Sequence, residues 1–303
     1  MIPLNRHGPA IFLRKARRWL EPALDPARVG RVFEEFDVDR GYAEWHARCR
    51  AALARPLPAR PSPAPVVQDG FQVLTAMAPE TAAGLLAAAG TGQSTGRLKR
   101  DSAKLEGYEL DDPALVERLV GAALPAAVDD ACLSFFASEY FVYWATLART
   151  APVEGPASVS FMWHCDRGPR AHLKLLVYLN DHAEHGGGTS YLDLAASDAV
   201  ARSGYLFARG RRRTDSLDGL SKLAGRPLAA YEHHPHAGDA VLFQPSRVLH
   251  RGVTPHLGPR YVLTLCLLPS PVPWREALGR SAQIDLRHDP LWHDDARALA
   301  GRF

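Results

Sequence analysis

The six residues FMWHCD occupy positions 161–166 and end a β-prone run with a histidine and an aspartate two positions apart. In an extended backbone, residues i and i+2 point to the same face, so His164 and Asp166 can reach one ion while Cys165 points away. A neutral imidazole and a carboxylate suit a divalent first-row metal. The stretch therefore predicts part of a metal site at the end of a strand.

A third ligand is expected from a different strand. His250 lies 84 positions after Asp166 (250 − 166), in the β-prone stretch VLHRGV. Two histidines and one carboxylate form the facial triad of non-haem iron(II) oxygenases, which leaves further coordination positions open. We therefore interpret His164, Asp166 and His250 as the metal ligands and as the catalytic centre.

An arginine follows the third ligand by ten positions (260 − 250). Arg260 begins the β-prone run RYVLT, and an arginine can grip a carboxylate through two parallel hydrogen bonds. Thr264 shares the face of Arg260 on that strand. The pair is predicted to bind the distal carboxylate of 2-oxoglutarate, whose keto-acid end would chelate the iron. The alternative, in which His164 is a surface residue and Asp166 a turn former, does not explain Arg260 at this spacing.

The size and charge of the chain favour a globular domain and give no indication of a nucleic-acid partner. Its 303 residues are 47% hydrophobic, which is enough for a sizeable core in one domain with extensions. Charged residues make up 23% of the chain and the net charge is +3, so bulk charge does not argue for nucleic acid. The sequence leaves the oligomeric state open.

The cysteine pattern and the hydropathy favour a cytoplasmic protein. The four cysteines are far apart and form no CxxC pair, which argues against a disulfide framework. No apolar stretch approaches the roughly 18 residues needed to span a bilayer, and none resembles a signal peptide. The basic segment 10–20 is interpreted as a helix packed on a domain, the alternative being a helix on a membrane surface. We therefore expect no membrane association.

Turn residues and periodicity divide the chain into three parts. Residues 1–65 are predicted to form a helical extension ending in a proline-rich linker, 66–275 a mainly β domain with flanking helices, and 276–303 a tail packed on that domain. Helices are expected at 79–89 and 113–124. Short strands, typical of a sandwich or barrel, are expected at 70–74, 132–148, 157–163, 172–180, 189–193, 203–208, 228–233, 239–243 and 260–268.

The strand expected at 172–180 has two distinct faces. Its odd-numbered positions from 173 to 177 are all apolar and suit the core. Lys174 and Tyr178 share the other face, so they could line the cavity and touch the cosubstrate. The alternative for Lys174 is a position in solvent.

Two polar segments receive a simpler interpretation. The basic run 209–213 is predicted to be a solvated turn, the alternative being a rim of the active site that attracts an anionic substrate. His233, His234 and His236 are interpreted as an exposed turn before and after a proline, the alternative being a second metal site.

From about residue 70 to 275, the chain resembles the phytanoyl-CoA dioxygenase-like branch of the 2-oxoglutarate oxygenases. The resemblance is carried by DGFQVL at 69–74, LND at 179–181 with EHGG at 184–187, and GD at 238–239 followed by HRG at 250–252 and Arg260. It implies a double-stranded β-helix (jelly roll) flanked by helices. It also implies Fe(II) on His164, Asp166 and His250, 2-oxoglutarate on Arg260, and dioxygen as the oxidant.

One stretch departs from this pattern on the substrate side. The family often has a Pro-Gly-Ser-His motif where this chain reads TSYLDL at 189–194, so we do not expect the acyl-CoA substrate of the family's name. The predicted reaction is hydroxylation of an unactivated C–H bond of a small-molecule substrate, with release of succinate and carbon dioxide. Desaturation and ring formation stay open. The alternatives are a peptide or protein hydroxylase and a non-catalytic jelly-roll binding protein.

Overall fold

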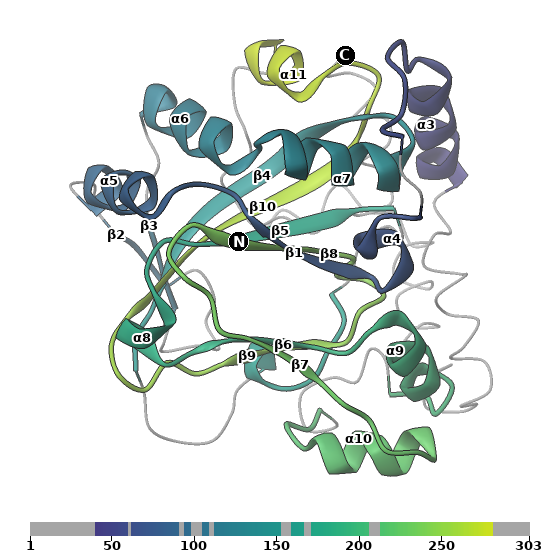
Figure 1. The fold of residues 1–303 in the computed structure, drawn as a ribbon, viewed down its shortest axis with the longest axis vertical. Coiled ribbons are helices and arrows are strands. Elements are labelled where there is room, and N and C mark those ends of the chain that lie inside the picture. Colours follow the sequence, from purple (N-terminus) through teal and green to yellow (C-terminus); the bar gives the residue numbers. More distant parts are fainter. Residues whose placement is uncertain are drawn as a thin grey trace, which may run out of the picture.

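Two antiparallel sheets form the body of the protein. The computed structural model describes residues 40–59, 62–90, 94–97, 105–108, 112–152, 159–166, 171–205 and 213–280. Within these ranges the larger sheet has the order β1 (Phe71–Thr75), β8 (Asp239–Phe243), β5 (Leu173–Tyr178), β10 (Arg260–Ser270), β4 (Glu139–Thr150), β3 (Leu105–Tyr108) and β2 (Ser94–Arg97). The smaller sheet faces it and has the order β7 (Tyr231–His233), β6 (Gly188–Tyr191) and β9 (His250–Val253) (Figure 1).

The chain crosses repeatedly between the two sheets as it runs from β4 to β10. It leaves the larger sheet after β4, pairs with β9 at His164, returns as β5, and crosses again as β6 and β7. It then returns as β8, crosses as β9 and ends in the larger sheet as β10. This path is that of a double-stranded β-helix, or jelly roll. The predicted fold class, mainly β with flanking helices, is therefore confirmed.

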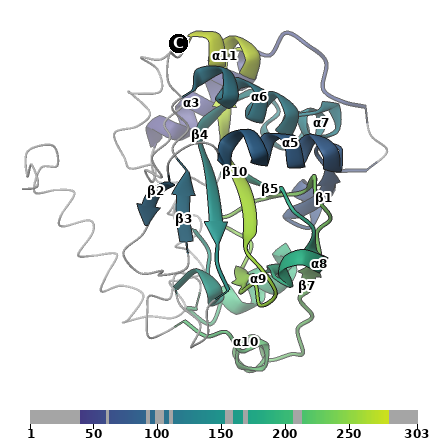
Figure 2. The same ribbon diagram turned by 90° about the vertical axis from the view of Figure 1, so that its left-hand side faces the viewer.

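Helices cover the outer face of the larger sheet. The helices α5 (Pro79–Gly90), α6 (Pro113–Ala123) and α7 (Ala126–Phe136) lie over it in Figures 1 and 2. Leu173 and Leu175 of β5 are buried in the same apolar cluster as these helices. Because side chains alternate along a strand, the even-numbered residues of β5 point into the space between the sheets.

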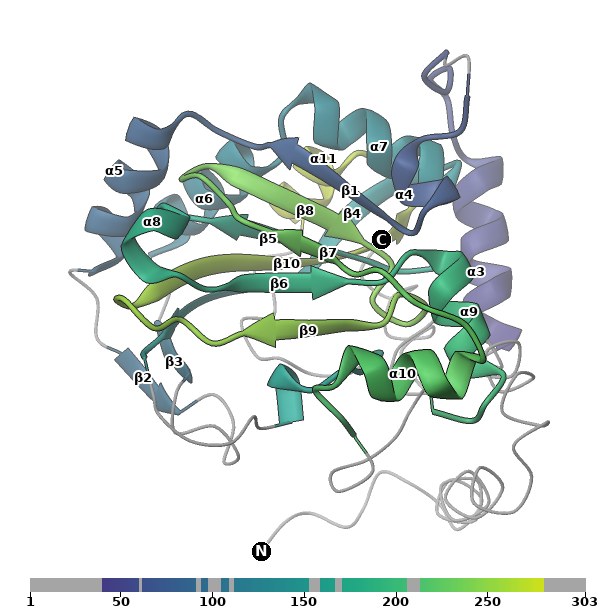
Figure 3. The same cartoon turned by 60° about the horizontal axis from the view of Figure 1, so that its bottom comes forward.

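The remaining helices lie around the edges of the two sheets. They are α3 (Arg40–Ala51), α4 (Pro65–Gln68), the 3₁₀ turn η1 (Val159–Phe161), α8 (His182–His185), α9 (Leu194–Ala201), α10 (Leu217–Ala224) and α11 (Trp274–Arg280). α9 and α10 lie beside one end of the smaller sheet (Figure 3), where Val200 and Leu220 form an apolar cluster with Trp163 and Cys165. The segment that carries His164 therefore packs against α9 and α10, two helices that the sequence patterns did not predict.

The helices predicted at 79–89 and 113–124 are confirmed as α5 and α6, and each differs from the prediction by one residue at its C-terminal end. The start of α6 has a clear local cause, because Asp112 accepts a hydrogen bond from the Ala114 backbone N–H at 2.9 Å and Pro113 occupies the first turn. Strands overlap the predicted ranges near 70, 172, 189, 228, 239 and 260, and apart from β8 their ends differ from the prediction by a few residues.

Three predicted strands are wrong in whole or in part. Residues 132–136 belong to α7, whose buried residues Val128, Ala131, Cys132 and Phe136 repeat at helical spacing, and β4 begins only at Glu139. Residues 159–161 form a 3₁₀ turn, and pairing begins at His164. Residues 203–205 form no strand, while 206–208 lie outside the described residues. For residues 132–136, burial of α7 against the larger sheet outweighs the local β-propensity.

Arg55 links the proline-rich segment to the domain. Arg55 pairs with Asp129 of α7 at 2.7 Å and with Glu139 of β4 at 2.7 Å. The rest of the predicted extension before residue 40, and the tail after residue 280, lie outside the described residues. Among the described helices, none alone is long and apolar enough to cross a membrane; α6 and α7 pass that test only as a pair, bent by 78°.

Replacing Gly238 with alanine is expected to destabilise the protein by about 3 kcal/mol, because this turn requires glycine. Gly238 has a φ of +90°, and a Cβ there would lie 2.1 Å from the Met77 carbonyl oxygen. The matched control is Gly121→Ala in α6, where a Cβ meets no atom within 4 Å. That change should be neutral or stabilise by up to about 1 kcal/mol. Denaturant unfolding of both variants measures the difference; equal stabilities would contradict the role of Gly238.

Candidate metal centre

The backbone brings His164 and His250 together although they are far apart in sequence. The His164 backbone N–H donates to the His250 carbonyl at 3.0 Å, and the His250 N–H donates back to the His164 carbonyl at 2.9 Å. This single bridge joins the end of FMWHCD to β9 and places the two imidazole centroids 4.4 Å apart. Asp166 is held next to them because its N–H donates to the Pro245 carbonyl at 2.7 Å.

The three side chains present their ligand atoms to one another. His164 Nε2 lies 3.6 Å from Asp166 Oδ1, and His250 Nε2 lies 3.5 Å from Asp166 Oδ2. All the ligand atoms of this group lie within 4.8 Å of one another. Nitrogen and oxygen atoms at this separation fit a first-row divalent metal, and three protein ligands leave room for others.

The second nitrogen of each imidazole is bonded to the backbone. His164 Nδ1 lies 2.7 Å from the Met162 carbonyl, and His250 Nδ1 lies 2.9 Å from the Val248 carbonyl. A carbonyl only accepts, so each Nδ1 carries the proton and each Nε2 is left with a lone pair for a metal. Both rings are thus held in the tautomer that ligation requires.

The electrostatics favour the ligating protonation states. Burial, assisted by the neighbouring His250, lowers the pKa of His164 to about 3, so this imidazole is neutral at physiological pH. Burial alone would raise the pKa of Asp166, but Lys174, followed by His250 and His164, holds it well below its usual range. Neutral imidazole and ionised carboxylate are the forms that bind a metal.

Lys174 lies inside the centre and not in solvent. Its Nζ donates to Asp166 Oδ2 at 2.5 Å, and its side chain is 12% exposed. The hypothesis that the even-numbered face of β5 lines the cavity is therefore confirmed for this residue. Tyr178, on the same face, is fully buried and donates to Thr189 Oγ1 at 2.8 Å.

Arg260 is a buried cation between the two sheets. It retains 7% of its exposure, and one terminal nitrogen donates to the carbonyls of Gly188 and Val253, the latter at 3.0 Å. Its Nε has no hydrogen-bond partner, and no carboxylate among the described residues pairs with it. Burial lowers the pKa of Arg260, yet an arginine stays charged at neutral pH. A buried charge with no counter-ion indicates an anion-binding position.

Aromatic side chains lie between Arg260 and the metal ligands. Tyr191 is paired with His250 across β6 and β9, and their ring centroids are 6.5 Å apart. Phe243 of β8 lies 4.9 Å from the His250 ring and 5.2 Å from the Tyr191 ring. Tyr191 also acts electrostatically on Arg260. Sequence reasoning missed Tyr191, although the alternation of TSYLDL could have placed it on this face.

Thr264 lies on the same strand as Arg260 and is half-buried opposite Leu176 of β5 and Thr146 of β4. Its four-residue separation from Arg260 corresponds to about 13 Å along a strand. Among the described residues no hydrogen bond joins Thr264 to the Arg260 guanidinium, so the part of Thr264 in ligand binding stays a prediction.

Arg213 is the one described residue of the basic run 209–213. The backbone of its neighbour Thr214 accepts a hydrogen bond from the Trp163 N–H at 2.8 Å, so this segment runs beside FMWHCD. Arg213 is half-buried and contributes to the lowered pKa of His164, after burial and His250. At this residue the run lies close to the metal centre, contrary to the prediction of a solvated turn.

The predicted histidine turn is only partly exposed. His233 is buried, as is His185 of α8, and burial lowers the pKa of each to about 4. His234 and His236 are exposed; His236 pairs with Asp181 at 2.8 Å. Among the described residues, His164, Asp166 and His250 are the one group close enough to hold a metal, so nothing favours a second site here.

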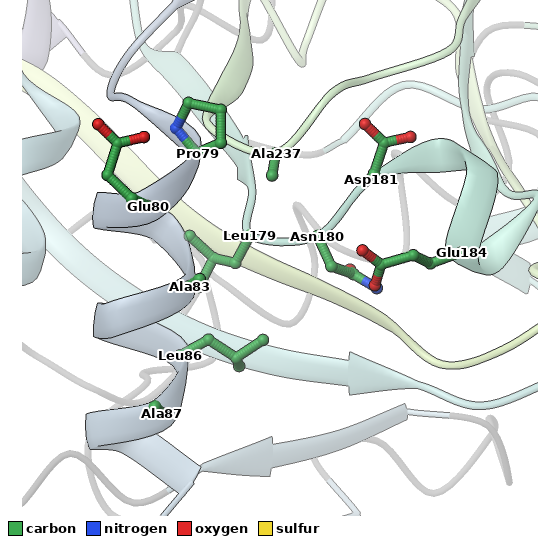
Figure 4. Close-up of a pocket in the computed structure, with 10 residues that line it drawn as sticks. All are labelled: Pro79, Glu80, Ala83, Leu86, Ala87, Leu179, Asn180, Asp181, Glu184 and Ala237. Atoms are coloured by element: carbon green, nitrogen blue, oxygen red, sulfur yellow. The ribbon is translucent and has the colours of Figure 1, made fainter.

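A separate surface pocket of about 660 Å³ lies between α5 and the segment that follows β5. Figure 4 shows Glu80, Asp181 and Glu184 at its edges and Leu179 and Leu86 in its wall. Leu179 belongs to the core on the outer face of the larger sheet. The pocket contains none of the three ligands and lies on the other side of that sheet from them.

No protein-family model matches the chain, and no curated protein matches it. The similar solved structures include HygX from Streptomyces hygroscopicus with nickel and 2-oxoglutarate bound, at 14% identity over 68% of this chain and 85% of that one, with a TM-score of 0.44. They also include the epimerase SnoN with Fe³⁺, alpha ketoglutarate and nogalamycin RO, at 13% identity over 82% and 94%, TM-score 0.47. EctD from S. alaskensis with bound Fe is 16% identical over 71% and 82%, TM-score 0.45. Because these similarities are low, the chemistry of this chain has to be argued from its own residues.

Proposed function

We propose that this chain is an Fe(II)- and 2-oxoglutarate-dependent oxygenase that uses dioxygen to hydroxylate an unactivated C–H bond of a small molecule, releasing succinate and carbon dioxide. One observation carries the proposal. A group of two histidines and one carboxylate shares the space between the sheets with a buried arginine that has no carboxylate partner among the described residues. The first feature suits iron(II), and the second suits the far carboxylate of a dicarboxylic acid.

Each residue then has a defined task. His164, Asp166 and His250 would hold the iron, and Arg260 would orient 2-oxoglutarate through its distal carboxylate. The metal and cosubstrate supply the oxidising chemistry when bound, while the protein positions the reacting groups. Tyr191 and Phe243 lie beside His250 and would shield this side of the centre from water.

Thr264 would bind 2-oxoglutarate at a different point from Arg260. Because it lies about 13 Å along the strand from Arg260, it would contact 2-oxoglutarate nearer the metal than the distal carboxylate does.

A small-molecule substrate fits the burial of the centre better than a protein does. His164 and His250 keep only 7% and 6% of their exposure, so the reacting carbon must enter a confined space. The phytanoyl-CoA dioxygenase-like branch remains our assignment within the oxygenases, without its acyl-CoA substrate. A peptide hydroxylase would need a groove that a chain segment can enter.

The test is formation of the iron–2-oxoglutarate chromophore. Purified protein is kept free of oxygen, and Fe(II) and then 2-oxoglutarate are added. A weak visible charge-transfer band is expected with both ligands and absent with Fe(II) alone. Pyruvate, a keto acid without the distal carboxylate, is expected to give the band only at much higher concentration. If the protein binds Fe(II) but saturating 2-oxoglutarate gives no band, and no succinate forms over a substrate panel, the chain is a jelly-roll binding protein.

A further inference from the structure

We propose that Lys174 is a positioning residue of the metal centre, which neutralises Asp166 and withholds one of its two carboxylate oxygens from the metal. The inference rests on the metal centre of the proposed function but not on the oxidation it carries out. Lys174 is on β5 and comes from neither of the two segments that supply the three ligands.

The position of Lys174 is set by the sheet and by one aromatic ring. In the larger sheet it pairs with Cys266 of β10 and with Phe243 of β8, on the face that points between the sheets. Its Nζ lies 5.3 Å from the centroid of the Trp144 ring, which provides a favourable cation–π contact. With the side chain only 12% exposed, the ammonium has little access to water and is directed at Asp166.

The two oxygens of Asp166 have different neighbours. Oδ2 accepts the hydrogen bond from Lys174 at 2.5 Å and also lies 3.5 Å from His250 Nε2, whereas Oδ1 lies 3.6 Å from His164 Nε2 and accepts no hydrogen bond from the ammonium. A charge-assisted hydrogen bond of this length is among the stronger ones in proteins. Because Lys174 already engages Oδ2, Oδ1 is the oxygen left for a metal, and the carboxylate would then occupy one coordination position instead of two.

This arrangement has two consequences of opposite sign. The ammonium repels a divalent cation bound to the same carboxylate, so it weakens metal binding. It also keeps a coordination position open, so it favours a ligand that binds the metal through two atoms. A lysine that only packed against Trp144 would, on removal, loosen the site and weaken both.

The test compares Lys174→Met with the wild-type protein and with Lys222→Met, a matched control in α10 whose side chain is exposed. Co(II) is the metal probe, titrated by calorimetry into metal-free protein, followed by 2-oxoglutarate into the Co(II)-loaded protein. For Lys174→Met we expect the Co(II) dissociation constant to fall at least ten-fold and that of 2-oxoglutarate to rise. The control should give the wild-type dissociation constants. Lys174→Arg keeps the positive charge and should also give the wild-type values.

Two results would overturn the proposal or part of it. A Co(II) dissociation constant that is unchanged or higher in Lys174→Met would contradict the proposal that Lys174 is the counter-ion of Asp166. Unchanged 2-oxoglutarate binding, alongside tighter Co(II), removes the claim about the second oxygen. If Lys174→Met does not fold, Lys174→Gln keeps a hydrogen-bond donor without the charge, and the same Co(II) criterion applies to it. A wild-type protein that binds Co(II) but not 2-oxoglutarate contradicts the proposed oxygenase while leaving the Co(II) test of Lys174 intact.

Discussion

Replacing Asp166 with asparagine is expected to weaken Co(II) and Fe(II) binding by more than about 100-fold, beyond the range typical for the loss of an outer-sphere partner. The amide keeps the shape of the carboxylate but removes its charge, and the remaining His164 and His250 provide only two neutral donors. Calorimetric titration with Co(II) measures the loss. The chromophore with 2-oxoglutarate should disappear in parallel, and turnover with it.

The same substitution is also expected to change stability, because it leaves Lys174 buried without its partner. Removing one member of a buried ion pair costs about 3–5 kcal/mol, and the 26% exposure of the Asp166 side chain reduces this to about 2 kcal/mol. The double variant Asp166→Asn/Lys174→Met should recover most of that loss, while metal binding stays absent. An Asp166→Asn protein that binds Co(II) at wild-type affinity would refute the ligand assignment.

Replacing Arg260 with methionine is expected to raise the 2-oxoglutarate dissociation constant by about 100-fold, or about 2.7 kcal/mol, with metal binding unchanged. Methionine fills similar volume but cannot grip a carboxylate. Pyruvate provides the matched comparison, because it lacks the distal carboxylate and should bind the wild type and the variant equally. Anaerobic titration of the visible band with each keto acid measures both constants.

The stability of Arg260→Met separates ligand binding from a structural role. The variant loses the hydrogen bonds to the Gly188 and Val253 carbonyls, but it also removes a buried charge that has no anion among the described residues. These effects oppose each other, so we expect the free energy of unfolding to change by less than about 2 kcal/mol. Equal losses in affinity for 2-oxoglutarate and pyruvate would mean that Arg260 does not hold the distal carboxylate.

Local patterns predicted the parts of this protein that obey a two-residue or a helical period. Apolar alternation in β5 separated the core face from the inner face, and the structure places Lys174 on the inner face accordingly. The helix at α6 was predictable because Asp112 and Pro113 form a local start signal. The C-terminal half of α7 was not, because Cys132 to Phe136 have strand-like composition and become helical through packing on the larger sheet.

The chemical types and the spacing of the centre are readable in the order of the amino acids: HxD, a distant histidine, and an arginine ten positions after it. Three features depend on the folded chain: the bridge between His164 and His250 aligns two imidazoles, Arg260 is buried without a carboxylate partner among the described residues, and Lys174 takes one oxygen of Asp166. Donor types and periodicity are local properties of the chain. Desolvation and ion pairing instead depend on which segments cross between the sheets and meet there.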